Sequence, residues 1–97
     1  MHVAAIEFDL HIPSSRSLKA KRSVVRPIVE GARRRYGLSV AEVAHHGQWQ
    51  RAGIGMAAVG SSPERVCAIL DEVERFVWSR PDVEVISAHR SWIDDEA

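Results

Sequence analysis

The side chains with the clearest chemical potential are basic residues that recur at helical spacing. Lys19, Arg22, Arg26 and Arg33 fall within about 60° of one another on a helical wheel and extend about 21 Å along the helix axis. We call these four residues the basic ridge. Phosphates are attracted to such a ridge by charge and counterion release, and arginine adds bidentate hydrogen bonds. One interpretation of the pattern is a site for RNA phosphates; the other is a solvated helix face whose charges are balanced by acidic residues, within the molecule or across a dimer.

A second candidate site lies at the start of the same helix. Ser17 can cap the helix, and Lys21 falls inside the apolar sector of the wheel. In one interpretation the stem of Lys21 is buried and its ammonium reaches solvent. In the other, the ammonium lies beside Ser15, Arg16 and Ser17, where the free N–H groups of the helix start also favour a phosphate. Both interpretations stay open on the sequence alone.

Polar and aromatic residues also gather around a predicted hairpin: Glu42, His45, Trp49, Gln50 and Arg51. Tryptophan and arginine are favoured anchors of protein interfaces, so His45, Trp49 and Arg51, together with Trp92 of the last predicted strand, are candidates for an interface on the sheet. The adjacent histidines of this segment point to opposite faces of a strand and have no partner acids at a recognised ligand spacing. We therefore expect no metal site.

Enzyme chemistry has little support in the sequence. The chain has no asparagine, which acylphosphatases of similar fold use in catalysis, and no serine in a nucleophile elbow. Cys67 lies on the core-facing edge of a predicted helix, where a thiol is usually inert. We expect a protein that is not an enzyme, without a cofactor or a small-molecule substrate.

The elements that position these residues follow from hydrophobic periodicity. Alternation predicts strands, and apolar stripes predict helices that begin after the caps Ser17 and Ser62. The first helix has Leu18, Val25, Ile28, Val29, Ala32 and Tyr36 on its apolar side, and Pro27 on the opposite side should bend it. The predicted elements are a strand at 3–12, a helix at 18–36, strands at 38–46 and 49–60, a helix from 63 that ends before Pro81, and a strand at 83–93.

This order predicts the α+β, ferredoxin-like βαββαβ fold: a four-stranded antiparallel sheet with two helices on one face and the other face open. A length of 97 residues suits one domain over residues 1–97. On the predicted open face, Glu7 and Asp9 take positions where RNA-reading sheets of this kind present aromatic side chains. We therefore expect any contact with RNA to be made by the ridge and not by the sheet.

The net charge is zero, but it is unevenly distributed. Residues 11–37 contain eight basic residues and one acid, whereas residues 61–97 contain nine acids and four arginines. Such asymmetry bears on partners and not on fold. No apolar run reaches the roughly 20 residues that span a bilayer, and the N-terminus lacks the pattern of a secretory leader. We expect no membrane contact and a cytoplasmic location.

Two motifs carry a resemblance to a known family. The passage Ser15-Arg16-Ser17-Leu18-Lys19 with Lys21-Arg22, and the segment Ala41-Glu42-Val43 with His45 and Trp49-Gln50-Arg51, resemble the YlxP family, small bacterial proteins grouped as a domain of unknown function. The resemblance implies a ferredoxin-like fold. It also implies a role linked to RNA or the ribosome, because the genes of such proteins often lie beside translation genes. It supplies no catalytic residue.

Two hypotheses follow. In the first, the protein is a non-enzymatic module that binds structured RNA or a ribosomal particle through the ridge, with Arg16 and Lys21 at its mouth. In the second, it is a homodimeric interaction module that uses its open sheet face and binds no nucleic acid.

Overall fold

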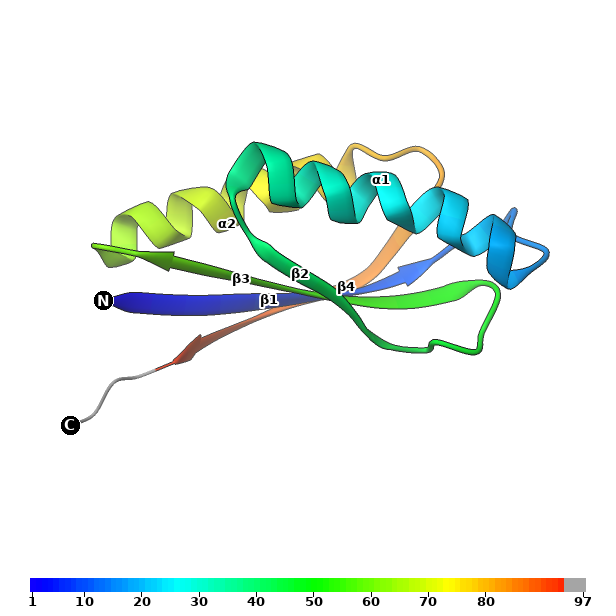
Figure 1. Cartoon of the computed structure of the whole chain (residues 1–97), viewed down its shortest axis with the longest axis horizontal. Helices are drawn as coiled ribbons and strands as arrows, with labels where there is room; N and C mark the ends of the chain where they lie inside the picture. The colour runs from blue at the N-terminus through cyan, green and yellow to red at the C-terminus, as the bar shows by residue number, and fades with distance from the viewer. Residues whose placement is uncertain (94–97) are drawn as a thin grey trace.

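The computed structural model describes residues 1–93 and contains four strands and two helices in the predicted order (Figure 1). The sheet order is β2-β3-β1-β4, and every neighbouring pair is antiparallel. This arrangement confirms the ferredoxin-like fold. The elements are β1 (His2–His11), α1 (Leu18–Tyr36), β2 (Ser39–Ala44), β3 (Arg51–Gly60), α2 (Pro63–Trp78) and β4 (Glu84–Ile93).

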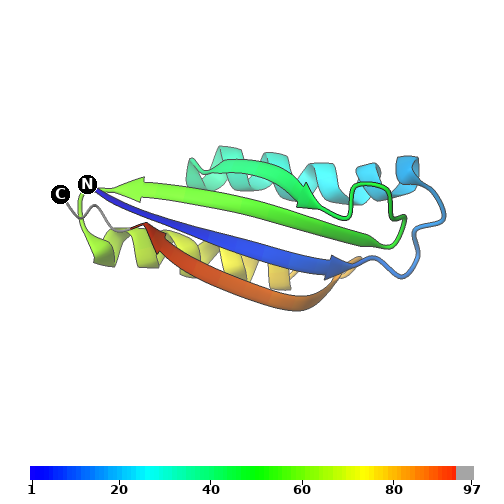
Figure 2. The same cartoon turned by 90° about the horizontal axis from the view of Figure 1, so that it is seen from below.

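Both helices cover one face of the sheet, and the other face is open (Figures 1 and 2). Alternate residues of β1 and β3 point toward the helices and are almost fully buried, as the period-2 pattern predicts. The helices contribute one apolar side each, and both stripes meet the sheet in a single core. The largest fully buried side chains are Ile6, Phe8, Leu10, Ile12, Ile28, Ile54, Met56, Val66, Leu70, Val73 and Val77.

The helix ends lie where the sequence predicts them. Ser17 caps α1 by accepting a hydrogen bond from the backbone N–H of Ala20, and Ser62 caps α2 in the same way with Arg65. Gly37 ends α1 in the left-handed region, with φ 65°, where a side chain is disfavoured. Pro27 lies on an exposed side within α1, which continues through it as one helix.

Leu18 is not part of the core, contrary to the helical wheel. Its side chain is 38% exposed, whereas Val25, Ile28 and Ala32 are buried as expected. Lys21, almost a turn further along α1, already hydrogen-bonds the carbonyl of Arg51, the first residue of β3. Leu18 therefore lies past the end of the sheet, where no strand covers it.

The two strands of the hairpin are shorter, and the loop between them is longer, than the sequence indicates. β2 ends at Ala44 and β3 begins at Arg51, so residues 45–50 form a loop. His45 has φ 62°, a conformation outside the strand region, and this ends β2. Trp49 consequently belongs to the loop and not to the sheet.

Trp92 lies on the helix side of β4, which corrects its expected place on the open face. It pairs with Ala4, whose side chain is buried toward the helices, and paired residues share a face. The pairing shifts opposite Asp9 and Leu10, where Ile86 is an extra residue between Val85 and Ser87. This bulge reverses the alternation in the rest of β4.

Candidate functional site

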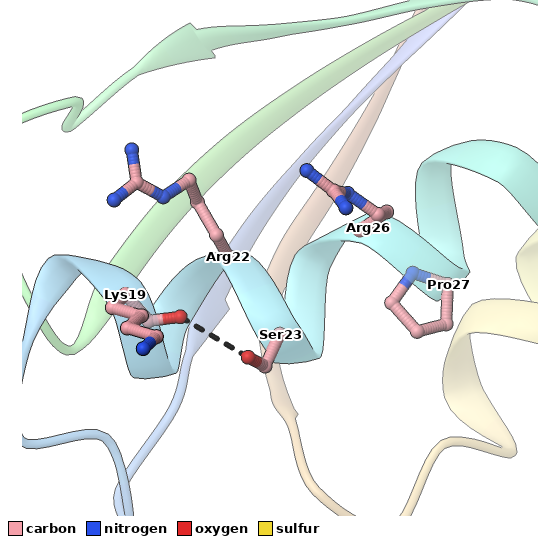
Figure 3. Close-up of a pocket in the computed structure, with 5 residues that line it drawn as sticks. All are labelled: Lys19, Arg22, Ser23, Arg26 and Pro27. Atoms are coloured by element: carbon pink, nitrogen blue, oxygen red, sulfur yellow. Dashed lines mark hydrogen bonds between the residues drawn. The ribbon is translucent and has the colours of Figure 1, made fainter.

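Three cations of the basic ridge surround a hollow on α1. Lys19, Arg22 and Arg26, with Ser23 and Pro27, line a space of about 440 Å³. Figure 3 shows Arg22 and Arg26 extending from the same side of the helix, one turn apart. The Ser23 hydroxyl donates to the carbonyl of Lys19 at 3.2 Å, so it is occupied locally. The open side of the hollow therefore presents positive charge.

Within residues 1–93, none of these three cations forms an ion pair. Arg90 gives the contrast, since it bonds Asp71 at 2.8 Å and Glu74 at 3.2 Å. Partial burial alone would lower the pKa of Arg90, but the hydrogen bonds and charges of these two acids raise it. Asp71 and Glu74 of α2 are thus engaged with Arg90 of β4 and form no ion pair with the ridge.

Arg33, the fourth ridge residue, has a structural contact. Its Nη2 donates to the carbonyl of Val40 at 2.7 Å and so joins α1 to β2. It also borders a second hollow of about 220 Å³ that adjoins Arg22 and Arg26. Arg33 remains exposed, but one of its donors is already used, and the acid Glu30 also lines this second hollow.

The structure excludes Lys21 from any anion site. Its side chain is 3% exposed, and Nζ donates to Glu42 Oε2 at 3.0 Å and to the carbonyls of His45, His46 and Arg51 at 2.9, 3.2 and 3.2 Å. Four oxygens share three N–H donors, so the ammonium has no donor to spare. The stem of Lys21 is buried, as the first interpretation has it, but the ammonium does not reach solvent and instead joins α1 to the hairpin.

The other members of the helix-start candidate are also occupied. Ser15 is 2% exposed and its hydroxyl donates to the carbonyl of Ser17 at 3.1 Å. The hydroxyl of Ser17 accepts the cap hydrogen bond from Ala20 at 3.0 Å. The hypothesis of a phosphate held by these serines and Lys21 is therefore wrong. Arg16 is exposed in the preceding loop and remains a candidate.

His45 and Arg51 meet on the open face at Asp9, which the sequence pattern had marked only as an acid in the place of an aromatic side chain. Arg51 makes a bidentate pair with Asp9, at 3.1 and 2.6 Å, and His45 Nε2 lies 3.7 Å from the same carboxylate. Register pairs such as Asp9 with Gly53 place this group on the sheet face away from the helices. The guanidinium of Arg51 is consequently less available to a partner than expected.

Two pairings at this end of the molecule were missed at the sequence level. A lysine in an apolar sector needs a buried acceptor, and Glu42 on the facing strand was the available carboxylate. Asp9 and Arg51 are brought together by the β1–β3 register, which periodicity does not supply.

Comparisons with known proteins identify the family. A family model described as "Protein of unknown function (DUF503)" matches residues 3–90. The chain belongs to the DUF503 family. This DUF503 chain is 31% identical over 86 residues to "Uncharacterized protein YlxP" of Bacillus subtilis (strain 168), which covers 89% of this chain and 94% of that protein. The resemblance to YlxP proteins is therefore confirmed, and the family description assigns no activity.

Two solved structures resemble the DUF503 chain in fold alone. The de novo designed protein Foldit4 has a TM-score of 0.59 at 11% identity, covering 92% of this chain and 96% of the designed one. A second de novo design with a ferredoxin fold has a TM-score of 0.54 at 9% identity, covering 100% of this chain and 89% of the design.

Neither α1 nor α2 combines the length and apolarity needed to cross a membrane. Among residues 1–93, no three His, Cys, Asp or Glu side chains converge in a way that could hold a metal ion.

Proposed function

We propose that this protein is a non-enzymatic, cytoplasmic module that binds the phosphate backbone of RNA, such as that of a ribosomal particle, through the basic ridge. The observation that carries the proposal is the hollow bordered by Lys19, Arg22 and Arg26, three cations that form no ion pair within residues 1–93. A protein gains little stability from leaving such a cluster unpaired, because like charges repel at this spacing. Phosphate oxygens would neutralise it and release counterions.

The sheet supports a backbone-binding mode and not a base-reading one. Its open face presents Glu7 at a central position and small residues such as Ala57 around it, with no phenylalanine, tyrosine or tryptophan on that face of the described strands. A surface of this kind offers no stacking platform. The proposed contact therefore involves charge and shape, with little dependence on sequence.

The test compares salt dependence in two charge-matched variants. For the wild type, three phosphate contacts give a slope of log K against log[salt] of about −2 to −3. The Arg22→Glu/Arg26→Glu variant should lose two contacts, which lowers affinity by at least about 25-fold at 0.1 M salt and reduces the slope by about 1.4 to 1.8. Fluorescence anisotropy with labelled RNA and co-sedimentation with ribosomal subunits at two salt concentrations measure both quantities.

The matched control is Arg34→Glu/Arg65→Glu, which makes the same change in net charge at two exposed arginines outside the hollow. Its affinity should remain within a few-fold of the wild type. Equal losses in both double variants would show a nonspecific charge effect and contradict the ridge as the binding site.

A second candidate, homodimerisation through the open face, has one observation in its favour. Val3 pairs with Val59 on β3 and with Ile93 on β4, so the three side chains share the open face. Val59 and Ile93 are each 63% exposed. An isologous contact would cover this apolar row, in place of the Trp49 and Trp92 anchors.

The Val59→Glu substitution tests this dimer. A carboxylate in an apolar contact should raise the dimer Kd by at least about tenfold, and the ridge on the helix side would be unaffected. Light scattering across a concentration series measures the mass of both proteins. A wild type with the mass of one chain at every concentration would dismiss the dimer.

A further inference from the structure

The loop at residues 45–50 presents a large aromatic side chain that the core does not use. Trp49 is 56% exposed, and it borders an open hollow of about 510 Å³ with Gly47, Gln48 and Gln50. It is absent from the buried core and from the apolar residues that pack against it. The tryptophan therefore contributes little to the stability of the fold.

The loop that carries Trp49 is nevertheless held firmly. Nζ of Lys21 donates to the carbonyls of His45 and His46 from inside the loop. The amide of Gln50 donates to the carbonyls of Pro13 and Ser15, both at 3.2 Å, and the backbone N–H of Ile12 donates to the carbonyl of Gln50 at 2.9 Å. An exposed aromatic on a fixed loop loses little conformational entropy when it binds a flat ligand.

The same bonds hold the loop of Trp49 against the β1–α1 loop, which leads into α1. Gln50, its neighbour in sequence, is bonded to the loop that contains Arg16, and Lys19 follows in the first turn of α1. Figures 1 and 2 both show the β2–β3 loop and the β1–α1 loop at the same end of the molecule. Within residues 1–93, neither Arg16 nor Lys19 forms an ion pair.

We infer that Trp49 is a stacking platform for an unpaired base of the RNA whose phosphates follow the ridge. The inference rests on the proposed function and narrows its ligand to RNA with a single-stranded segment. The indole face supplies sequence-tolerant stacking, and Arg16 and Lys19 are placed to contact the phosphates beside the stacked base. The amide groups of Gln48 and Gln50 beside the indole, with cations on the adjoining β1–α1 loop and helix start, suit a nucleotide better than an apolar protein segment.

The experiment measures the affinity of the full chain for two probes, a single-stranded adenosine octamer and a blunt 12-base-pair RNA duplex. The Trp49→Ala variant should bind the octamer about 5- to 140-fold more weakly and the duplex equally well. Its salt slope should match that of the wild type, because no charge is lost. Trp49→Phe should keep most of the octamer affinity, since it retains an aromatic face.

The outcomes separate the inference from the proposed function. If Arg22→Glu/Arg26→Glu weakens binding to both probes but Trp49→Ala binds the octamer as the wild type does, the stacking platform is wrong and the ridge stands. If the wild type binds neither probe, both are wrong. If Trp49→Ala instead halves the mass of the protein in solution, Trp49 is a contact between copies and the inference fails. An unchanged denaturation midpoint shows that Trp49→Ala is folded.

Discussion

The Lys21→Met variant should lose about 3 kcal/mol of unfolding free energy, roughly 12 to 24 °C in Tm for a chain of this size. Methionine fills the space of the lysine stem, so the loss measures the ammonium and not a cavity. Without it, Glu42 has an unpaired carboxylate that is only 26% exposed, and three carbonyl groups each lose one donor. Chemical denaturation followed by circular dichroism measures the difference.

Lys19→Met is the matched control, because Lys19 is exposed on the same helix two residues earlier. It should change stability by less than about 0.5 kcal/mol. The double variant Lys21→Met/Glu42→Leu should recover part of the loss, since no unpaired carboxylate remains. Equal stability of the two single variants would refute the structural role of Lys21.

The Gly53→Ala substitution should destabilise the protein by about 2 to 3 kcal/mol. A Cβ atom at Gly53 would lie 2.7 Å from Cβ of Ala44 and 3.2 Å from its backbone nitrogen. Two of the three atoms that the new Cβ would meet are backbone atoms of Ala44, which cannot turn away as a side chain can. β2 and β3 must therefore separate at this point, where β2 enters the loop at residues 45–50. Thermal and chemical unfolding of the variant measure the cost.

Gly55→Ala is the comparison on the same strand. Its new Cβ would meet Cγ1 of Val43 at 3.1 Å, and this side chain is 49% exposed and free to turn away. Alanine also lowers the conformational entropy of the unfolded chain, which stabilises the folded state and offsets the close contact. The unfolding free energy should therefore change by less than about 1 kcal/mol. If Gly55→Ala lost as much unfolding free energy as Gly53→Ala, replacement of any glycine in β3 would be equally destabilising. The close approach to Ala44 would then not explain the loss at Gly53.

The sequence predicted the fold well because its main signals are local. Alternation in β1 and the caps at Ser17 and Ser62 depend on a few neighbouring residues, and the helix predicted at 18–36 matches α1 (Leu18–Tyr36). The errors arose where the position of a residue depends on parts of the chain that are distant in sequence. A helical wheel assigns Leu18 to the apolar side of the helix. It cannot show that the sheet ends before the first turn of α1, so that no strand lies opposite Leu18.

The same distinction explains the candidate site. The ridge was visible because Lys19, Arg22 and Arg26 share one helix, whereas the partners of Lys21 come from two strands and a loop more than twenty residues away. The face of Trp92 depended on one extra residue, Ile86, which no periodicity analysis of β4 would reveal.

The burial of Lys21 should make its amine much less reactive than that of Lys19. The sequence contains two lysines, Lys19 and Lys21, of which the first is exposed and the second almost fully buried. Apart from the α-amino group, an amine-reactive reagent should acylate Lys19 at once and Lys21 only when the start of α1 separates from the β2–β3 loop. The rate of this slower acylation reports the free energy of a local opening beneath the proposed RNA site, with no label introduced.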